Sequence, residues 1–351
     1  MYRLKTILLL SIAVCFCACS SDDDDIEPLP YIYPGNPGSS GNSGDSGDSG
    51  NSGNSGNGNY QSTAKVTVFT DNNGARAFVP DQFSVSSKSG ERVIKNGLVV
   101  IGPDGSEFVW VPTTTTELKV RDFGSYFSGG SIKGYQDETS KPIYQAMIES
   151  VKQYGGFYMG RYEASYGSGS SLSDYVPASK PVTGNRPGRI WVRFSPQDAT
   201  VACENLYRDN GSVQGFFPWG INWDTTLQWL IDSGCKTREQ VANNSTSWGN
   251  YSDDTFSLNA GGNYTGAYEE AKANNIYDLA GNNWEWTQER NGTTNYVMRG
   301  GGYNLMGGSC SGSRYPAAVR DPLPGNDHHP NVCFRVALFL KLGALQQSEE
   351  G

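Results

Sequence analysis

The chain has 351 residues and a formal net charge of -9, with 44 glycines and 12% aromatic residues. This length suits one large domain or two small ones with a substantial core. Because phosphate binding needs a basic surface, the negative charge argues against a nucleic-acid-binding protein. Abundant glycine and little long helical periodicity favour a loop-rich fold with short strands over a helical bundle.

Residues 1–19 are predicted to form an export signal. Arg3 and Lys5 precede a 13-residue apolar stretch, which is too short to span a bilayer. The stretch ends in Ala18 followed by Cys19, which resembles a bacterial lipoprotein processing site. We therefore expect Cys19 to carry the lipid and to become the first residue of the mature protein. An ordinary cleaved signal peptide is the alternative.

Residues 20–60 are predicted to be an acidic tether and a flexible linker. The run SSDDDD resembles the signal that directs lipoproteins to the outer face of some Gram-negative bacteria. From Gly41 to Gly56 a glycine recurs at every third residue without the prolines of collagen, so we expect a flexible spacer. It would span roughly 30 Å. The expected location is the outer membrane, with a lipid anchor and the body facing the cell exterior.

The next segments are predicted to be strands. Residues 61–96 read as an extension with short strands at 64–70 and 77–87. Residues 97–112 predict two strands around a Pro-Asp-Gly turn.

Three stretches predict helices. Residues 141–155 have apolar positions near helical spacing and end in glycine. Residues 195–211 begin with a Ser-Pro cap, and residues 222–234 have one apolar face and a glycine near the end. Beyond residue 236 we expect mostly loops and short strands, closing with one buried strand at 332–341.

Seven cysteines divide into three in the leader and four in the body. An even number in an exported domain predicts two disulfides, and the spacing leaves all three pairings open. None of the four has the CxxC spacing of a zinc site. The four candidates are Cys203, Cys235, Cys310 and Cys333.

Several separated segments resemble one family, the formylglycine-generating (sulfatase-modifying factor) family, whose fold is C-type-lectin-like. The segments are EFVWVP, FYMGRYEAS, KPVT with SPQDATVAC, DLAGNNWEWT, MRGGGY and VCFRVALFL. GINWDTTLQWL and SWGNY resemble a branch common among bacterial surface proteins. The resemblance implies an α+β, C-type-lectin-like domain at residues 97–341, rich in loops with short strands and few helices, followed by a tail at 342–351.

The segment DLAGNNWEWT admits two interpretations. In a strand Trp284 and Trp286 share one face and Glu285 takes the other, so the segment can be core with a solvated glutamate. Alternatively, hard oxygen ligands cage Ca²⁺. The family has a structural calcium at the matching positions, so the resemblance implies this site. Its ligands would be the carboxylates of Asp278 and Glu285 and the carbonyls of Gly281 and Asn283.

The resemblance also allows a test for catalysis. Family enzymes oxidise a cysteine of a client sulfatase with O₂ and copper held by two cysteine thiolates, three and eight residues after a serine. Here Gly302 stands at the serine position, Leu305 at the first cysteine position and Cys310 at the second. One thiolate cannot form this copper site, so copper is not expected and the interpretation leans away from an enzyme. The chain's two histidines, at 328 and 329, are too few for the iron-binding branch or a Ser-His-Asp site.

Family disulfides link the helix near Cys203 to the last strand. The resemblance therefore implies a Cys203–Cys333 pair, which leaves Cys235 with Cys310.

The preferred hypothesis is a binding module for a surface glycan or protein ligand, because polar and aromatic side chains are dense at residues 302–331. Its expected contacts are Trp284, Tyr303, Asn304, Arg314, Tyr315 and Asp327. One alternative is an oxidase that matures sulfatases, which would need Cys310 as a thiolate. Others are a binding protein diversified by retroelement-driven mutagenesis and a structural subunit of a surface complex.

Overall fold

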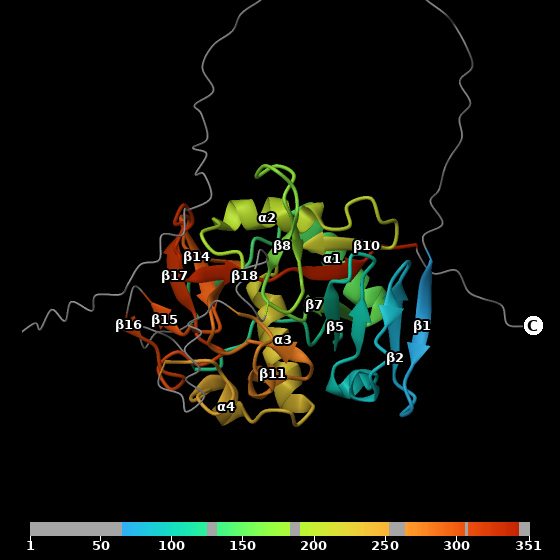
Figure 1. Ribbon diagram of the computed structural model, residues 1–351, viewed down its shortest axis with the longest axis horizontal. Helices are drawn as coiled ribbons and strands as arrows, with labels where there is room; N and C mark the ends of the chain where they lie inside the picture. Colours follow the sequence, from blue (N-terminus) through green and yellow to red (C-terminus); the bar gives the residue numbers. More distant parts are fainter. Residues whose placement is uncertain (1–64, 125–131, 183–189, 253–263, 306–307, 344–351) are drawn as a thin grey trace, which may run out of the picture. The chain divides into compact units, whose positions relative to one another are not determined.

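The computed structural model describes residues 65–124, 132–182, 190–252, 264–305 and 308–343 (Figure 1). All of these residues lie in one unit of the chain, Tyr60–Gly351. The predicted leader, lipidation residue Cys19, tether and linker lie outside the described residues, as does almost all of the predicted tail.

The larger sheet has six strands in the order β10-β19-β7-β5-β4-β3, with every neighbouring pair antiparallel. Its strands are β3 (Ser84–Val85), β4 (Val99–Ile101), β5 (Glu107–Pro112), β7 (Gly156–Gly160), β10 (Val213–Phe216) and β19 (Ala337–Leu340). The predicted hairpin at 97–112 is confirmed as β4 and β5. Strand β3, which lies in the predicted extension at 61–96, pairs with β4 at the edge of this sheet.

The second sheet runs in the order β17-β14-β13-β18, and β6 also pairs with β13. Its strands are β6 (Tyr135–Gln136), β13 (Trp284–Asn291), β14 (Asn295–Arg299), β17 (Asp321–Pro324) and β18 (Val332–Phe334). The single last strand that we expected is wrong: β18 and β19 belong to different sheets, and Arg335 and Val336 connect them. The charged side chain of Arg335 is fully buried at this crossing, where it finds several hydrogen-bond acceptors.

Four short antiparallel pairs and three 3-10 turns complete the strand-rich part. The pairs are β1 (Val66–Thr70) with β2 (Arg76–Pro80), β8 (Ser165–Ser168) with β9 (Val176–Ala178), β11 (Lys272–Ala273) with β12 (Ile276–Tyr277), and β15 (Asn304–Leu305) with β16 (Gly308–Ser309). The turns are η1 (Ser89–Glu91), η2 (Ile94–Asn96) and η3 (Glu269–Ala271).

The helices begin and end largely where their local signals predict. Helix α1 (Pro142–Tyr154) ends at Gly155, whose φ of 75° is the left-handed conformation that glycine adopts without strain. Helix α2 (Pro196–Asn205) has a capping box in which Ser195 and Asp198 bond to each other's backbone N–H groups. It ends six residues before the expected Gly211, because the chain turns to pack on β10.

Helix α3 (Gly220–Asp232) starts two residues earlier than expected, and the carboxylate of Asp137 accepts from the backbone N–H groups of Gly220 and Ile221 at 2.9 Å. The short helix α4 (Arg238–Ala242) was not expected; Thr237 and Gln240 form its capping box. Together the elements make a loop-rich α+β fold with few helices, as predicted. No helix in the described ranges is long and apolar enough to cross a membrane.

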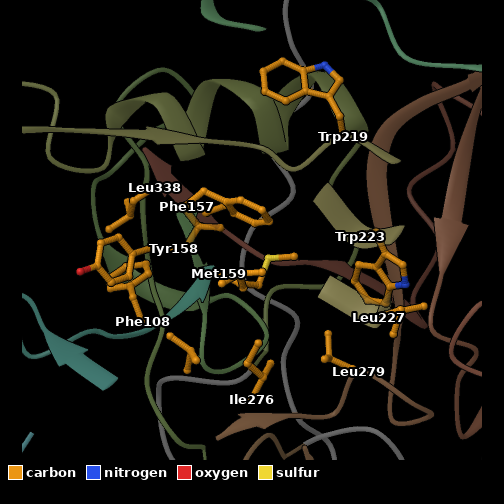
Figure 2. Packing of buried hydrophobic residues seen from close by; sticks show 14 of the residues in the cluster. Phe108, Phe157, Tyr158, Met159, Trp219, Trp223, Leu227, Ile276, Leu279 and Leu338 are labelled. Carbon is orange, nitrogen blue, oxygen red and sulfur yellow. The ribbon is translucent and has the colours of Figure 1, made fainter. Parts of the chain in front are cut away.

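The core packs helices α1, α2 and α3 against the larger sheet. Phe108, Tyr158 and Leu338 come from the adjacent strands β5, β7 and β19 and are completely buried. Figure 2 shows them with Met159 and with Trp223 of α3. Burying side chains of this size is the main stabilising contribution in such a domain.

A buried quartet of charges joins α3 to the second sheet. We name it the ion quartet; it consists of Asp224, Glu289, Arg299 and Arg320, and each side chain is 0% exposed. Asp224 and Glu289 each contact both arginines, at distances up to 3.1 Å. Two carboxylates balance two guanidinium groups, which is how charges are accommodated in an interior. Arg320 also donates to the carbonyl of Arg121 at 3.4 Å, so the quartet reaches the loop after β5.

Candidate functional site

The turn at Asp278–Asn283 lies at the centre of the motif DLAGNNWEWT. Asp278 has a φ of 59° and Asn282 a φ of 62°, conformations that Asp and Asn tolerate better than most residues. Gly281 has a φ of 74°, and a Cβ there would lie 2.2 Å from the carbonyl oxygen of Asn250. The backbone N–H of Asn282 donates to that same carbonyl at 2.7 Å. The motif spacing is thus required by a tight turn against a neighbouring loop.

Three buried carboxylates lie beneath this turn. Glu163 accepts from the backbone N–H of Asn283 at 3.1 Å, and also from the side-chain amide of Asn282. Asp278 accepts from the hydroxyl of Thr265 at 2.8 Å and from the backbone N–H of Gly266 at 2.9 Å. Glu285 is the third. Glu163 was not among the residues predicted from the sequence, although it lies in the segment FYMGRYEAS, three residues after the end of the buried strand β7.

Glu285 is paired with Arg335, which corrects the expectation of a solvated glutamate. Both oxygens of Glu285 face the guanidinium of Arg335, with an Nε to Oε2 distance of 3.0 Å. The same guanidinium donates to the carbonyls of Gly160 and Tyr277, each at 3.0 Å. Strand β13 is therefore buried on both faces, with tryptophans on one and this ion pair on the other.

The three carboxylates have one cation beside them, the guanidinium of Arg335, and this excess of negative charge affects their pKa values. Burial raises the pKa of Glu163 well above its ordinary value, and the nearby Asp278 and Glu285 raise it further. Burial likewise raises the pKa of Asp278 to about 6, although the Gly266 N–H group opposes the change. With all groups ionised the cluster would have a formal charge of -2, which favours either a bound proton or a bound cation.

The ligands that the sequence predicts for calcium are only partly brought together. Asp278 is one of the three buried carboxylates, and Gly281 and Asn283 lie in the turn next to them. Both oxygens of Glu285 contact Arg335 instead. Among the described residues, no group of three or more His, Cys, Asp or Glu side chains is arranged to hold a metal ion. Carboxylate oxygens such as those of Asp278 are the donor type that a hard cation prefers.

Three tyrosines surround the turn, and we name them the tyrosine face: Tyr264, Tyr268 and Tyr303. All three are half-buried. The carbonyl of Tyr264 accepts from the side chain of Asn282 at 2.8 Å, and the backbone N–H of Tyr303 donates to the carbonyl of Asn282 at 2.7 Å. Burial raises the pKa of Tyr268, and the nearby Asp278, Tyr264 and Tyr303 add to the rise. Of the three, only Tyr303 was among the expected contacts.

The other expected contacts are divided between core and surface. Trp284 is 0% exposed, so the expectation that it contacts a ligand is wrong. Its ring packs edge-on against Tyr315, 5.3 Å between centroids, and Tyr315 is also buried. The exposed Arg314 covers the Tyr315 ring at 5.2 Å, so this stack leads from core to surface.

The remaining two expected contacts are Asp327 and Asn304. Asp327 is half-buried and lies near His329. The neighbouring His328 is exposed, and its Nδ1 lies 3.0 Å from the Arg193 carbonyl. The side chain of Asn304 lies outside what the structure describes.

Gly302 stands at the position of the family's serine, and the indole of Trp284 fills the space that a side chain there would need. A Cβ on Gly302 would lie 2.6 Å from Cδ1 of Trp284, so no larger residue fits while that indole keeps its place. The structure does not describe the side chain of Leu305, but leucine has no atom that can ligate copper. Cys310 is buried and is the one thiol among these three positions. The residues present therefore do not fit a two-thiolate copper site.

The structure does not show the two predicted disulfides. Within the described part of the chain, Cys203, Cys235, Cys310 and Cys333 are all thiols. Cys235 is exposed whereas Cys310 is buried, and the Cys333 thiol is hydrogen-bonded to Glu163. Burial raises the pKa of both Cys203 and Cys333, which keeps these thiols protonated and unreactive.

Comparisons with known proteins support the resemblance over the second half of the chain. Residues 211–339 match the family model of the sulfatase-modifying factor enzyme 1-like domain. This range contains DLAGNNWEWT, MRGGGY and most of VCFRVALFL. No curated protein sequence matches the chain.

Three solved structures show low similarity to the chain. CarF has 14% identity and a TM-score of 0.34, covering 53% of this chain and 86% of that one. PvdO from Pseudomonas aeruginosa has 14% identity and a TM-score of 0.39, covering 73% and 100%. Treponema denticola variable protein 1 has 12% identity and a TM-score of 0.27, covering 78% and 98%.

Proposed function

We propose that the chain is a lipid-anchored surface protein whose sulfatase-modifying-factor-like domain, of C-type-lectin-like fold, binds a glycan or protein ligand and does not oxidise cysteine. The observation that carries this proposal is that the indole of Trp284 lies against Gly302. It fills the space next to Gly302 that a serine of the copper site would need. With Leu305 at one thiolate position, the donor set for copper is incomplete.

The tyrosine face supports a binding role. Half-buried tyrosines offer flat apolar area together with hydroxyl groups, and ordering them costs little conformational entropy. The turn beneath them is rigid, because its backbone bonds to Asn250 and its side chains bond to the buried Glu163. The exposed Arg314 adds a charged donor on the neighbouring stack. A preorganised surface of this kind suits recognition of a polar partner.

The test combines one binding assay with one oxidation assay. The full chain is applied to arrays of glycans and of surface proteins, alongside Tyr303→Ala, Arg314→Ala and the control Tyr166→Ala. Tyr166 is 46% exposed on β8, and its ring packs against Tyr175 and Trp191. We expect a ligand whose binding weakens at least about tenfold in the first two variants and is unchanged in the control.

The oxidation assay uses Cu(I), O₂ and a cysteine-containing sulfatase peptide. We expect no turnover by the wild-type chain. Turnover that disappears in Cys310→Ser would overturn the binding-module proposal in favour of an oxidase.

A structural Ca²⁺ at the buried carboxylates is part of the proposal. The support is the charge excess beneath the turn, which a divalent cation held by Asp278 and the Gly281 and Asn283 carbonyls would neutralise. We expect Ca²⁺ to raise the unfolding temperature of the full chain at neutral pH and to have little effect on Asp278→Asn. Equal responses of the two proteins, or none in the wild type, would remove calcium from the proposal.

The lipid anchor is proposed from the sequence around Cys19. Replacing Cys19 with alanine should move the protein from the membrane fraction to the soluble fraction after expression in a Gram-negative host. Retention of the variant in the membrane would contradict the anchor without affecting the binding proposal.

A further inference from the structure

A cluster of aromatic side chains reaches the surface at the hairpin of β8 and β9. Tyr166 of β8 is 46% exposed, and Tyr175, directly before β9, is half-buried. Trp191 is half-buried as well, and its backbone N–H donates to the carbonyl of Ala164 at 2.8 Å, which places it beside the hairpin. Its ring centroid lies 5.6 Å from that of Tyr166 and 5.3 Å from that of Tyr175. We name Tyr166, Tyr175 and Trp191 the aromatic platform.

Trp191 differs from the other tryptophans of the chain. There are eight, all within the described ranges, and the other seven are buried. Among the described residues, neither the indole N–H of Trp191 nor the hydroxyl of Tyr175 has a hydrogen-bond partner, and neither is a buried unpaired atom. Both polar groups are therefore open to a ligand from solvent. An aromatic ring with an accessible polar tip suits a partner that has apolar and polar faces.

The platform is supported from behind and from the side. Phe194 stacks on the ring of Trp191, with 4.8 Å between centroids, and packs in turn on the completely buried Phe334 at 5.5 Å. The side chain of Asn205, at the end of α2, donates to the carbonyl of Tyr175 at 2.9 Å. These contacts join the exposed rings to the core and to a helix. A preformed surface of this kind loses little entropy on binding.

The polar surroundings of the platform fit a neutral ligand. The segment 168–174, which leads from β8 toward β9, contains four serines and one charged residue, Asp174. Asp174 accepts from the backbone N–H groups of Ser170 and Ser171 at 3.0 and 2.6 Å, so its carboxylate is already hydrogen-bonded within the segment. The exposed Arg193, two residues after Trp191, balances this charge. Neither an anion nor a cation is favoured, whereas the serine hydroxyls suit a ligand that both donates and accepts.

The size of the platform favours a glycan over a protein partner. A stable protein interface buries about 800 Å² on each side and involves roughly 20–30 residues. Three neighbouring rings instead match one or two sugar units. The C–H groups of a sugar ring form an apolar face that packs on an aromatic ring, while its hydroxyl groups bond to an indole N–H or a phenol.

We propose that the aromatic platform is a second binding site, which takes a neutral glycan by stacking a sugar unit on Tyr166 and Trp191. The hydroxyl groups of the sugar bond to the indole N–H of Trp191 and to the hydroxyl of Tyr175. The site uses none of the residues of the tyrosine face.

The test measures acrylamide quenching of the intrinsic fluorescence of the full chain, titrated with cellobiose, maltose and lactose. Acrylamide reaches Trp191 more readily than the seven buried tryptophans, so a bound sugar should reduce the quenching in a saturable way. We expect at least one of the three sugars to do so. Tyr166→Ala should weaken that binding by about tenfold or more. Trp191→Ala, whose folding is checked by circular dichroism, should weaken it equally in a ligand-observed NMR titration.

Two variants serve as matched controls. Val68→Ala shortens a side chain that is 39% exposed on β1, and Tyr303→Ala changes the tyrosine face; both should bind the sugar as the wild type does. A ligand that is lost in Tyr303→Ala and kept in Tyr166→Ala is the result expected for the tyrosine face, so the two proposals fail separately.

Three results would overturn the inference. The first is that none of the sugars binds, and the second is that Tyr166→Ala binds the sugar as tightly as the wild type does. The third is a dimer of the wild-type chain in analytical ultracentrifugation that disappears in Tyr166→Ala, which would assign the platform to a second copy of the chain.

Discussion

Replacing Glu289 with glutamine tests how much the ion quartet contributes to stability. The change keeps the side-chain shape and removes one of two negative charges from a cluster that is completely buried. It leaves Arg299 and Arg320 with a single carboxylate, that of Asp224. The buried net charge becomes +1, and the new amide also directs a donor toward guanidinium donors.

The magnitude follows from the contacts that are lost. Glu289 accepts from Arg299 at 3.1 Å and from Arg320 at 2.8 Å. Hydrogen bonds to charged groups contribute about 1.5–3 kcal/mol each, which gives roughly 3–6 kcal/mol for two. Breaking a buried ion pair by removing one partner costs about 3–5 kcal/mol, in agreement with this sum. We therefore expect Glu289→Gln to lower the free energy of unfolding by about 3–5 kcal/mol.

Urea unfolding of the wild-type chain, Glu289→Gln, Arg299→Met and the double variant measures this effect. The double variant restores charge balance, so its loss should be smaller than the sum of the single losses by roughly 0.5–3 kcal/mol. The loss in Glu289→Gln should not change with ionic strength, because buried charges are poorly screened. Glu149→Gln, which breaks an exposed pair with Lys152, should cost about 0–1 kcal/mol. A loss below about 1 kcal/mol in Glu289→Gln, or strict additivity in the double variant, would refute the reasoning.

Three further predictions concern other parts of the domain. Gly302→Ser should lower the free energy of unfolding by about 1–3 kcal/mol, because its Cβ collides with Trp284; a neutral effect would show that the indole moves easily. Alkylation followed by mass spectrometry should modify Cys235 first in the native chain and all four body cysteines in denaturant without reductant; a cysteine that needs reductant would reveal a disulfide. Burial raises the pKa of Asp321 to about 6, so the folded protein binds this proton more tightly than the unfolded chain does. The free energy of unfolding should therefore fall as the pH rises from about 4 to about 6, and Asp321→Asn should remove this part of a urea-unfolding pH profile. An unchanged profile in that variant would contradict the assignment.

Local signals in the sequence predicted many of the elements correctly. The hairpin of β4 and β5 follows from a Pro-Asp-Gly turn, and α1 ends at the predicted Gly155. The end of α2 was predicted six residues too late, and α4 was not predicted. Tertiary packing on β10 ends α2 early, and the five-residue α4 has too few residues to show a helical period.

The motifs predicted the place of the candidate site but not the role of its charges. DLAGNNWEWT indicated a site at 278–285, and the turn with its buried carboxylates lies there. The segment alone could not reveal that Arg335, 50 residues away, would pair with Glu285. Nor could it reveal that Glu163, 120 residues away, would bind the backbone of Asn283.

The sequence by itself determined the local features, because turns, caps and the residue at each motif position depend on a few neighbouring residues. The positive-φ positions of the turn at Asp278–Asn283 are Asp, Gly and Asn, which tolerate that conformation, and Leu305 cannot ligate a metal in any fold. Tertiary structure alone decided which charges meet and which indole fills the space beside Gly302. These outcomes depend on contacts between segments that are far apart in the chain, and the burial that makes those contacts strong exists only when the segments have packed together.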